Sequence, residues 1–368
     1  MDREGAMLEE LITLADCEAA ARRRLPKHVY DYVAAGAADE ITLARNRSAF
    51  GQLLLRPRFL KPVTAPELAT TVLGTAISLP VVLSPAAYQR NLHPDGEVAT
   101  CAGAARAATL AIVPAVTGER IEEVASAAEG PLWLQLYHRG RPTTESFAKR
   151  AEAAGYGALC VTVDIPAQNP RERDRRNWFL PPYEGVRFGL HDEAPVELRV
   201  PGYPFSVDDL HWLRERTRLP IVVKGVVTAD DAALAVERGA DGVFVSNHGA
   251  RMLDTTPSAI EVLAEVVAAV DGRAEVYVDS GVRRGTDVLK ALLLGARAVG
   301  IGRPWQWGLA VGGPAGVHRV LEILRLELEM AMTYCGQQSV QALTEGTLGI
   351  PSGWGPGTPA PAPQLSAG

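Results

Sequence analysis

The architecture of this chain can be worked out from AEVYVDSGVRRGTDVLKALLLGARAVGIGRP, which occupies residues 274–304. It begins and ends with short apolar runs (274–281 and 298–304), and the segment between them carries Val, Leu and Ala at helical spacing. Both runs are continuously apolar, which is typical of strands buried on both faces of a parallel sheet. The stretch therefore predicts a strand, a helix and a second, parallel strand.

The same rhythm continues through most of the chain, with helix-like segments such as IEVLAEVVAAV (260–270) between the apolar runs. Repeated strand–helix pairs predict a (β/α)8 TIM barrel, and the span 78–334 is close to the ~250 residues typical of that fold. A doubly wound open sheet, which normally has fewer strands, is the alternative. The eight runs lie at 79–85, 110–115, 132–137, 158–164, 220–226, 242–248, 274–281 and 298–304.

The segments outside the predicted barrel differ in pattern. Residues 13–37 have helical spacing and predict a helical N-terminal segment. Residues 46–77 contain several prolines and are predicted to be irregular. Residues 346–368 are rich in Gly and Pro and lack periodicity, which predicts a flexible, disordered tail. We therefore expect one domain over residues 1–345, followed by this tail.

Composition excludes several classes of protein. The chain has 368 residues, with 37 basic and 43 acidic side chains, so it lacks the basic excess of a nucleic-acid binder. No run approaches the ~18 apolar residues of a membrane span, and the acidic N-terminus does not resemble a signal peptide. The four cysteines are scattered, which favours neither a zinc site nor a disulfide framework. We expect a cytoplasmic protein without a metal, membrane or nucleic-acid partner.

Polar and ionisable side chains follow six of the predicted strands. Active sites of such barrels lie at the C-terminal ends of the strands. Contact with water could explain each residue alone, but together they favour a site. These residues are Gln135 and Tyr137 after the third strand, Thr162 and Asp164 after the fourth, Lys224 after the fifth, Ser246, Asn247 and His248 after the sixth, Asp279 and Ser280 after the seventh, and Gly302 and Arg303 after the eighth.

Glycine–arginine pairs follow the last two strands, as Gly281 with Arg283 and Gly302 with Arg303. Glycine N–H groups and arginine forks can together bind a phosphate, which many barrels hold at this place. The alternative is that the glycines serve tight turns and that the arginines are solvated. Both interpretations remain open on this pattern alone.

His248, Arg251 and Lys224 are further candidates for chemistry. Histidine is the side chain most readily used as a base near neutral pH, and the Arg251 fork suits a substrate carboxylate. A structural histidine at the start of a loop is the alternative. Lys224 ends a buried run, so it needs an anionic partner or a lowered pKa. It could form a Schiff base, as in a barrel aldolase, or hold negative charge on a ligand.

Several longer motifs occur together and in order over residues 10–345, and on these motifs the chain resembles the FMN-dependent α-hydroxy acid oxidase and dehydrogenase family. The resemblance implies FMN as cofactor, oxidation of a 2-hydroxy acid to a 2-oxo acid, and a homo-oligomer, either a tetramer or an octamer. The motifs are LPKHVYDYVAAGA (25–37), SPAAYQRNLHPDGE (84–97), VVKGV (222–226), SNHGARMLD (246–254), DSGVRRGTDVLKALLLGA (279–296) and IGRP (301–304).

The resemblance also implies roles for individual residues. His248 is similar to the family's active-site base, and Asp164 to the carboxylate that stabilises its imidazolium. The remaining matches are Arg251, Arg171 and Tyr32 for the substrate carboxylate, Tyr137 beside the substrate hydroxyl, Lys224 beside the flavin N1 and O2, Ser84, Pro85, Ala86, Ala87, Gln135, Thr162 and Ser246 for other flavin contacts, Asp279 for the ribityl chain, and Gly281, Arg283, Gly302 and Arg303 for the phosphate.

Departures from the family pattern bear on the substrate. Pro114 and Val116 stand where a hydroxyl residue and an aromatic are common, and Ser280 replaces a usual glycine. The region 177–206 is also shorter than the usual loop. These changes predict a roomier pocket and a substrate larger than glycolate. Tyr88 resembles the hydroxymandelate oxidase branch, which makes a mandelate-like acid the candidate.

The second substrate and the rival activities follow from the same resemblance. Ala87 is similar to the residue of the oxidases, so O2 is the expected acceptor, with H2O2 as product. A dehydrogenase or monooxygenase of the same family is the first alternative. A catalytically silent flavin-binding scaffold and a barrel aldolase or isomerase that uses Lys224 are the others.

Overall fold

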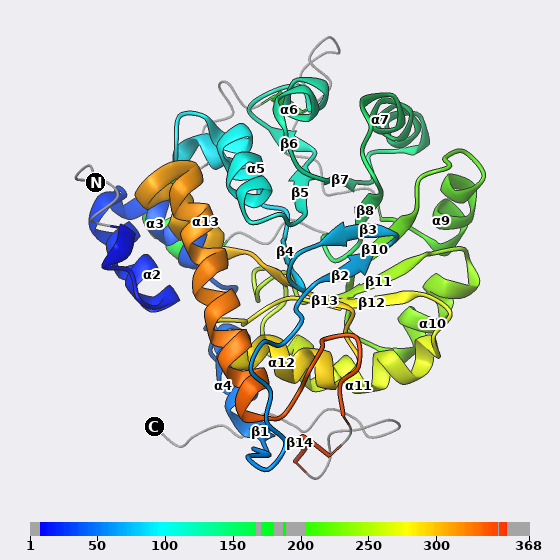
Figure 1. The fold of residues 1–368 in the computed structure, drawn as a ribbon. Coiled ribbons are helices and arrows are strands. Elements are labelled where there is room, and N and C mark those ends of the chain that lie inside the picture. Colours follow the sequence, from blue (N-terminus) through cyan, green and yellow to red (C-terminus); the bar gives the residue numbers. More distant parts are fainter. Residues whose placement is uncertain (1–7, 167–170, 180–186, 189–203, 345, 352–368) are drawn as a thin grey trace.

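The computed structural model describes residues 8–166, 171–179, 187–188, 204–344 and 346–351. Eight parallel strands close into a barrel that helices surround, and each of the predicted apolar runs contains one strand (Figure 1). The predicted (β/α)8 barrel is therefore confirmed. In their order around the barrel, the strands are β10 (Ile221–Val226), β11 (Gly242–Val245), β12 (Glu275–Val278), β13 (Ala298–Ile301), β4 (Val81–Leu83), β5 (Ala111–Pro114), β7 (Leu132–Tyr137) and β8 (Leu159–Thr162).

Helices cover the outside of the barrel, and their starts are set by local capping. Ser258, for example, forms a capping box with Glu261 at the start of one of them. The helices that follow the strands are α5 (Gly96–Arg106), α6 (Ile121–Ala127), α7 (Arg141–Ala154), α8 (Glu172–Arg176), α9 (Val207–Arg214), α10 (Ala229–Glu237), α11 (Ala259–Val270), α12 (Gly285–Leu293) and α13 (Arg303–Tyr334), the last kinked at Gly312 and Gly313.

The barrel interior is built in layers that follow the period of two along each strand. Every strand contributes one residue to a buried apolar cluster inside the barrel, in which the rings of Trp133 and Tyr277 meet edge to face at 5.5 Å. The residue two positions further along the same strand faces the same side, which places Gln135 above Trp133 and Asp279 above Tyr277. The residues that the eight strands contribute to this cluster are Val82, Ile112, Trp133, Cys160, Val222, Phe244, Tyr277 and Ala298.

The N-terminal segment partly agrees with the sequence-based prediction. Helices α2 (Leu14–Arg24) and α3 (Lys27–Ala34) confirm the predicted helical segment. The prediction that residues 46–77 are irregular is wrong. Helix α4 extends over Ile41–Gln52, and β2 (Thr70–Val72) pairs with β3 (Thr75–Ile77) as a hairpin. The prolines of this region, Pro57, Pro62 and Pro66, lie after α4 and before the hairpin, so they interrupt neither element.

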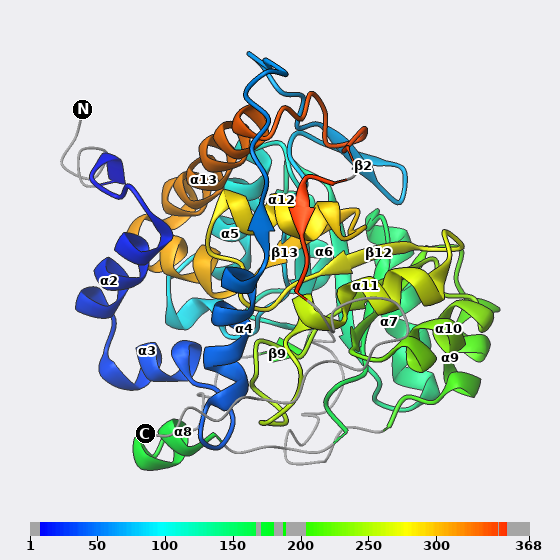
Figure 2. The same ribbon diagram turned by 90° about the horizontal axis from the view of Figure 1, so that it is seen from below.

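The boundary of the predicted tail also needs correction. The prediction that disorder begins at residue 346 is wrong, because β14 (Leu348–Gly349) pairs antiparallel with β1 (Leu54–Leu55). Figure 2 shows this red strand beside the blue one. Composition alone misses the pairing because the partner strand lies almost 300 residues earlier. Residues 352–368 lie outside the described residues. No helix in the described part is long and apolar enough to cross a membrane.

Candidate active site

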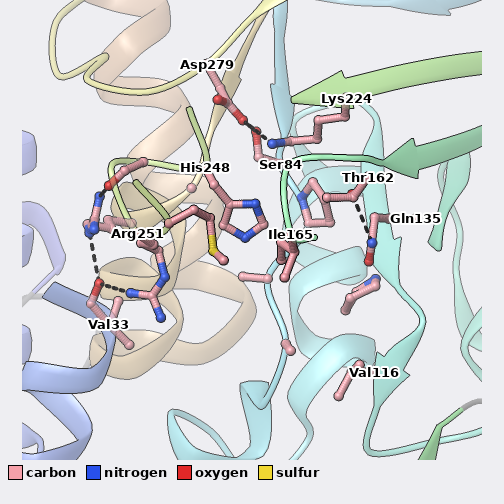
Figure 3. A pocket seen from close by; sticks show the side chains of 18 of the residues that line it. Val33, Ser84, Val116, Gln135, Thr162, Ile165, Lys224, His248, Arg251 and Asp279 are labelled. Atoms are coloured by element: carbon pink, nitrogen blue, oxygen red, sulfur yellow. Dashed lines mark hydrogen bonds and ion pairs between the residues drawn. The ribbon is translucent and has the colours of Figure 1, made fainter. Parts of the chain in front are cut away.

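A cavity of about 1100 Å³ opens at the C-terminal ends of the barrel strands. It brings together nearly all of the site residues predicted from the sequence, and Figure 3 draws 18 of its lining residues and labels ten of them. Asp164 and Ser246 are the two predicted site residues that do not line it, but they hydrogen-bond to lining residues. The lining includes Tyr32, Ser84, Pro85, Ala86, Ala87, Gln135, Tyr137, Thr162, Arg171, Lys224, His248, Arg251, Asp279, Gly281, Arg283, Gly302 and Arg303.

His248 and Asp164 form a pair at the cavity wall. The His248 Nδ1 atom lies 3.0 Å from Asp164 Oδ1, so the carboxylate orients the imidazole and leaves Nε2 for a ligand. Asp164 can approach because residue 225 is a glycine with φ +110, whose Cβ would lie 2.6 Å from Asp164 Cβ. The pair can therefore take up a proton at Nε2 and stabilise the resulting positive charge.

Lys224 and Asp279 form a buried ion pair beside this histidine. Lys224 Nζ lies 3.1 Å from Asp279 Oδ2, and it donates to Ser246 Oγ at 2.8 Å. Burial alone would lower the pKa of Lys224, but the carboxylates of Asp279 and Asp164 raise it overall. Burial would likewise raise the pKa of Asp279, but Lys224 lowers it overall. The lysine therefore presents a fixed positive charge to the cavity.

Two arginines flank the ring of Tyr32, with guanidinium carbons 4.8 Å (Arg171) and 5.1 Å (Arg251) from its centroid. Arg251 Nη1 donates to the carbonyl of Tyr32 at 2.7 Å, and Arg171 pairs with Asp174. Burial and the neighbouring charge of Arg171 together lower the pKa of Arg251 to about 10. Among the described residues, these two guanidinium groups have one carboxylate partner, Asp174. Their remaining positive charge suits a bound anion.

Tyr137 and Gln135 occupy the wall formed by β7. Burial, with the Asp164 carboxylate, raises the pKa of Tyr137, so its phenol remains a hydrogen-bond donor. The Gln135 side chain donates to Thr162 Oγ1 at 3.0 Å and accepts from the Ala115 amide at 3.4 Å. These contacts fix the orientation of the Gln135 amide.

The ends of β12 and β13 offer a second place for an anion. Arg283 Nε is buried and has no hydrogen-bond partner among the described residues, and burial lowers the pKa of this arginine to about 10. Gly302 faces open space, because a Cβ there would meet no described atom within 4 Å. Arg303 instead donates to three carbonyl groups, including that of Gly249 at 3.0 Å. Arg283 Nη1 donates to the carbonyl of Val282 at 2.9 Å, but its Nε is left for a ligand, and this Nε and the open Gly302 fit a phosphate.

Two supporting residues, Asn46 and Asp254, were not found from the sequence, and a third, Asn247, was predicted only as a polar residue after the sixth strand. The side chains of Asn46 and Asn247 exchange two hydrogen bonds of 2.8 Å, which join α4 to the loop of His248. Asp254 accepts from the amides of Ile41 and Thr42 and so caps α4. Asn247 and Asp254 lie inside the SNHGARMLD motif, which is a signal for them. Asn46 lies in the region predicted to be irregular, so nothing indicated it.

Residues 21–349 match the model of the family described as FMN-dependent dehydrogenase. The chain belongs to the FMN-dependent dehydrogenase family. Glycolate oxidase 5 of Oryza sativa subsp. japonica is 46% identical over 349 residues, which cover 91% of this chain and 95% of the relative. The glycolate oxidase of Spinacia oleracea is 45% identical with the same coverage.

Solved structures agree with this membership of the FMN-dependent dehydrogenase family. A structure of mandelate oxidase with (S)-2-phenylpropionate superposes with a TM-score of 0.83 and 40% identity, covering 90% of this chain and 96% of that one. A variant of an active chimera of (S)-mandelate dehydrogenase superposes with a TM-score of 0.88 and 35% identity, covering 92% and 99%.

The residues of the cavity fit the FMN of this family. FMN joins a flat ring to a ribityl chain that ends in a phosphate, and the buried, unpartnered Arg283 Nε needs such an anion. Gln135, Thr162 and Lys224 line the same cavity and supply donors for a ring. The predictions of an enzyme and of FMN as its cofactor are confirmed. The roles of individual residues remain predictions.

Proposed function

We propose that this protein oxidises a 2-hydroxy acid to a 2-oxo acid with FMN, and that O2 is reduced to H2O2. The observation that carries the proposal is the meeting of the His248–Asp164 pair with the cations Arg171 and Arg251 in one cavity. A 2-hydroxy acid needs both, because its carboxylate requires cations and its oxidation requires a base. The glycolate and mandelate oxidases among the relatives support this activity.

In this proposal, each side chain of the cavity has a separate role in the reaction. Arg251 and Arg171 hold the substrate carboxylate, and Tyr137 donates a hydrogen bond to the substrate hydroxyl. His248 Nε2 takes a proton from the substrate, and Asp164 stabilises the imidazolium through Nδ1. FMN, when bound, supplies the two-electron acceptor that later passes these electrons to O2.

The same cavity wall supplies the groups that would hold the cofactor. Lys224 provides a positive charge for the ring, because its partner Asp279 keeps it ionised. Gln135, Thr162, Ser246 and residues 84–87 would hold the other edges of the ring. Asp279 would hold the ribityl chain. The phosphate would be held by Gly281, Arg283, Gly302 and Arg303.

The substrate in this proposal is larger than glycolate and resembles mandelate. Tyr88 and Val116 line the cavity together with Met252, Phe179 and Phe205, so the region outside the charged groups is apolar and aromatic. Such a wall favours an aromatic or long aliphatic side chain, because it removes apolar surface from water. The mandelate oxidase relatives support this choice.

The proposal is tested on the purified yellow holoenzyme under anaerobic conditions. Glycolate, lactate, (S)-mandelate and a long-chain 2-hydroxy acid are added, and bleaching of the flavin absorbance is followed by stopped flow. We expect (S)-mandelate to bleach the flavin faster than glycolate, and air to restore the absorbance rapidly. A flavin that no acid bleaches would contradict the activity. Faster bleaching by glycolate than by (S)-mandelate would contradict the proposed substrate. Slow reoxidation of the flavin by air would contradict the proposed role of O2.

We also propose that residues 1–345, together with β14, form one cytoplasmic domain that assembles as a homotetramer or octamer. The four free, buried cysteines are consistent with a reducing compartment. Phe59, Leu60, Met330 and Tyr334 are exposed apolar residues that support self-association. Light scattering coupled to size exclusion measures the mass directly. A monomer would contradict the oligomer.

A further inference from the structure

The loop that carries His248 adopts an unusual backbone. His248, Gly249 and Ala250 all have positive φ, at 56°, 63° and 61°. Two of these residues are not glycine, and left-handed backbone is costly for residues with a side chain. Such a turn persists only where neighbouring groups hold it. The position of the base therefore depends on the contacts that anchor these three residues.

Two serine hydroxyls anchor consecutive amides of this loop. The His248 amide donates to Ser246 Oγ at 3.1 Å, and the Gly249 amide donates to Ser280 Oγ at 3.0 Å. Ser246 belongs to the same loop, whereas Ser280 follows the next strand of the barrel, β12. Ser280 therefore fixes the histidine loop to a different element.

Ser280 is itself held in a strained conformation. Its φ is +74°, in the region that favours glycine. Its side chain is buried, and Ser280 Oγ donates to Asp279 Oδ1 at 2.9 Å. Because the single hydroxyl hydrogen is committed to the carboxylate, a lone pair of Oγ faces the Gly249 amide. A glycine would remove the strain, but it could make neither bond.

Ser280 thereby joins two parts of the site. On one side, Asp279 uses its other oxygen to hold Lys224 at 3.1 Å and Ser84 at 3.0 Å. On the other side lies the amide next to His248. The Ser280 hydroxyl is thus a second bridge between the buried ion pair and the histidine loop, beside Ser246, whose Oγ accepts from Lys224 Nζ and from the His248 amide.

We propose that Ser280 is a positioning residue, whose hydroxyl holds the His248 loop against the Lys224–Asp279 pair. The inference rests on the proposed function only where it names His248 as the base. The hydroxyl does not touch the reacting atoms in this proposal, and it acts through Gly249 and Asp279. Loss of the hydroxyl weakens the anchoring of the His248 loop but removes no group that binds the substrate carboxylate. The loss should therefore lower kcat more than it changes KM.

The test compares Ser280→Ala and Ser280→Gly with the wild-type holoenzyme. Both variants lose the hydroxyl, but only Ser280→Gly also relieves the strain at φ +74°. Ser258→Ala is the control for loss of a buried serine hydroxyl, because Ser258 is also buried, stands at the start of α11 and does not line the cavity. The readouts are kcat and KM for the 2-hydroxy acid that bleaches the wild type fastest, thermal unfolding, and hydrogen exchange of the Gly249 amide.

We expect both Ser280 variants to lose about 3- to 10-fold in kcat, the range that one hydrogen bond supplies. KM should stay within about twofold, and the Gly249 amide should exchange faster in both variants. The control should keep kcat and the exchange rate. Ser280→Gly should unfold at a temperature no lower than Ser280→Ala.

Two results would overturn the proposal. One is unchanged kcat and unchanged Gly249 exchange in both variants. The other is recovery of wild-type kcat in Ser280→Gly, because that would assign the effect to strain rather than to the hydroxyl. The exchange measurement does not depend on turnover. If the wild type oxidises no 2-hydroxy acid, the proposed function fails, while faster exchange in the variants still supports the anchor and unchanged exchange removes it.

Discussion

Gly225 shapes the histidine–aspartate pair although it carries no side chain. It lies in β10 between Lys224 and Val226, where the pairing with β11 shifts register. Its φ of +110° suits glycine, and a Cβ there would lie 2.6 Å from Asp164 Cβ and Cγ. The irregularity thus leaves room for Asp164 beside Lys224, and the orientation of His248 depends on it.

Gly225→Ala should therefore reduce kcat by about 10- to 100-fold, because a displaced Asp164 misplaces the His248 ring. Steady-state kinetics on the FMN-loaded variant measure the loss. Gly155→Ala is the control, since Gly155 has φ +83° but a Cβ there meets no described atom within 4 Å. The control should lose stability and keep its kcat within about twofold. An equal loss of kcat in both variants would contradict the role of Gly225.

At the scale of elements, α4 is held by contacts with residues that lie far later in the sequence, in the segment that carries His248. Its first amides donate to Asp254, at 3.2 Å from Ile41 and 2.8 Å from Thr42. The reciprocal amide bonds between Asn46 and Asn247 secure its middle. Through these contacts, α4 fixes the loop of His248 from outside the barrel.

Asp254→Ala should lower the free energy of unfolding at pH 7 by about 1–2 kcal/mol, as loss of a helix cap does. Burial would raise the pKa of Asp254, but the amide of Thr42 and its neighbours lower it overall. Its folded pKa thus lies below the unfolded value of about 3.9, so its stabilisation is complete above that pH. The stabilisation is lost as the pH falls through the folded pKa.

Urea unfolding at a series of pH values checks this prediction. The difference between wild type and Asp254→Ala should be constant near neutrality and shrink below about pH 4. Asp39→Ala, at an exposed carboxylate, is the charge-matched control and should show neither effect. A difference that persists unchanged at low pH would show that the carboxylate charge does not stabilise α4.

At the scale of the whole molecule, the two flanks of the barrel are joined to each other. Strand β14 pairs with β1, and the Arg56 amide donates to the carbonyl of Thr347 at 2.8 Å. The side chain of Gln337 is buried and donates to Thr347 Oγ1 at 2.9 Å. The segment that follows α13, up to and including β14, therefore stabilises the folded protein.

Two truncations separate these contributions. A chain that ends at Pro351 should keep the thermal midpoint and kcat of the full chain, because every described contact remains. A chain that ends at Thr344 loses β14 and one of the hydrogen-bond partners of Gln337, the Thr347 hydroxyl. Its midpoint should fall by at least about 2 °C, which corresponds to 1 kcal/mol in a large domain. Equal midpoints for the two chains would contradict the stabilising role of β14.

The barrel and the rim of the site could be predicted because both depend on short-range patterns. Eight continuous apolar runs with helical segments between them specify the strands, and the period of two sets Asp279 above Tyr277 and Gln135 above Trp133. The hairpin of β2 and β3, helix α4 and strand β14 were missed. Helix α4 and strand β14 are stabilised by partners far away in sequence, which no local pattern reveals, whereas β2 and β3 pair with each other across a short turn that the prolines before them obscured.

The sequence by itself determined the architecture, the family motifs and the residue types that gather at the strand ends, because periodicity and residue chemistry are local properties. Only the tertiary structure showed which atoms meet: Nδ1 of His248 with Asp164, Asp279 with Lys224, and Ser280 with the amide of Gly249. Those meetings depend on the barrel, which brings the ends of adjacent and next-but-one strands within hydrogen-bonding distance although they lie tens of residues apart.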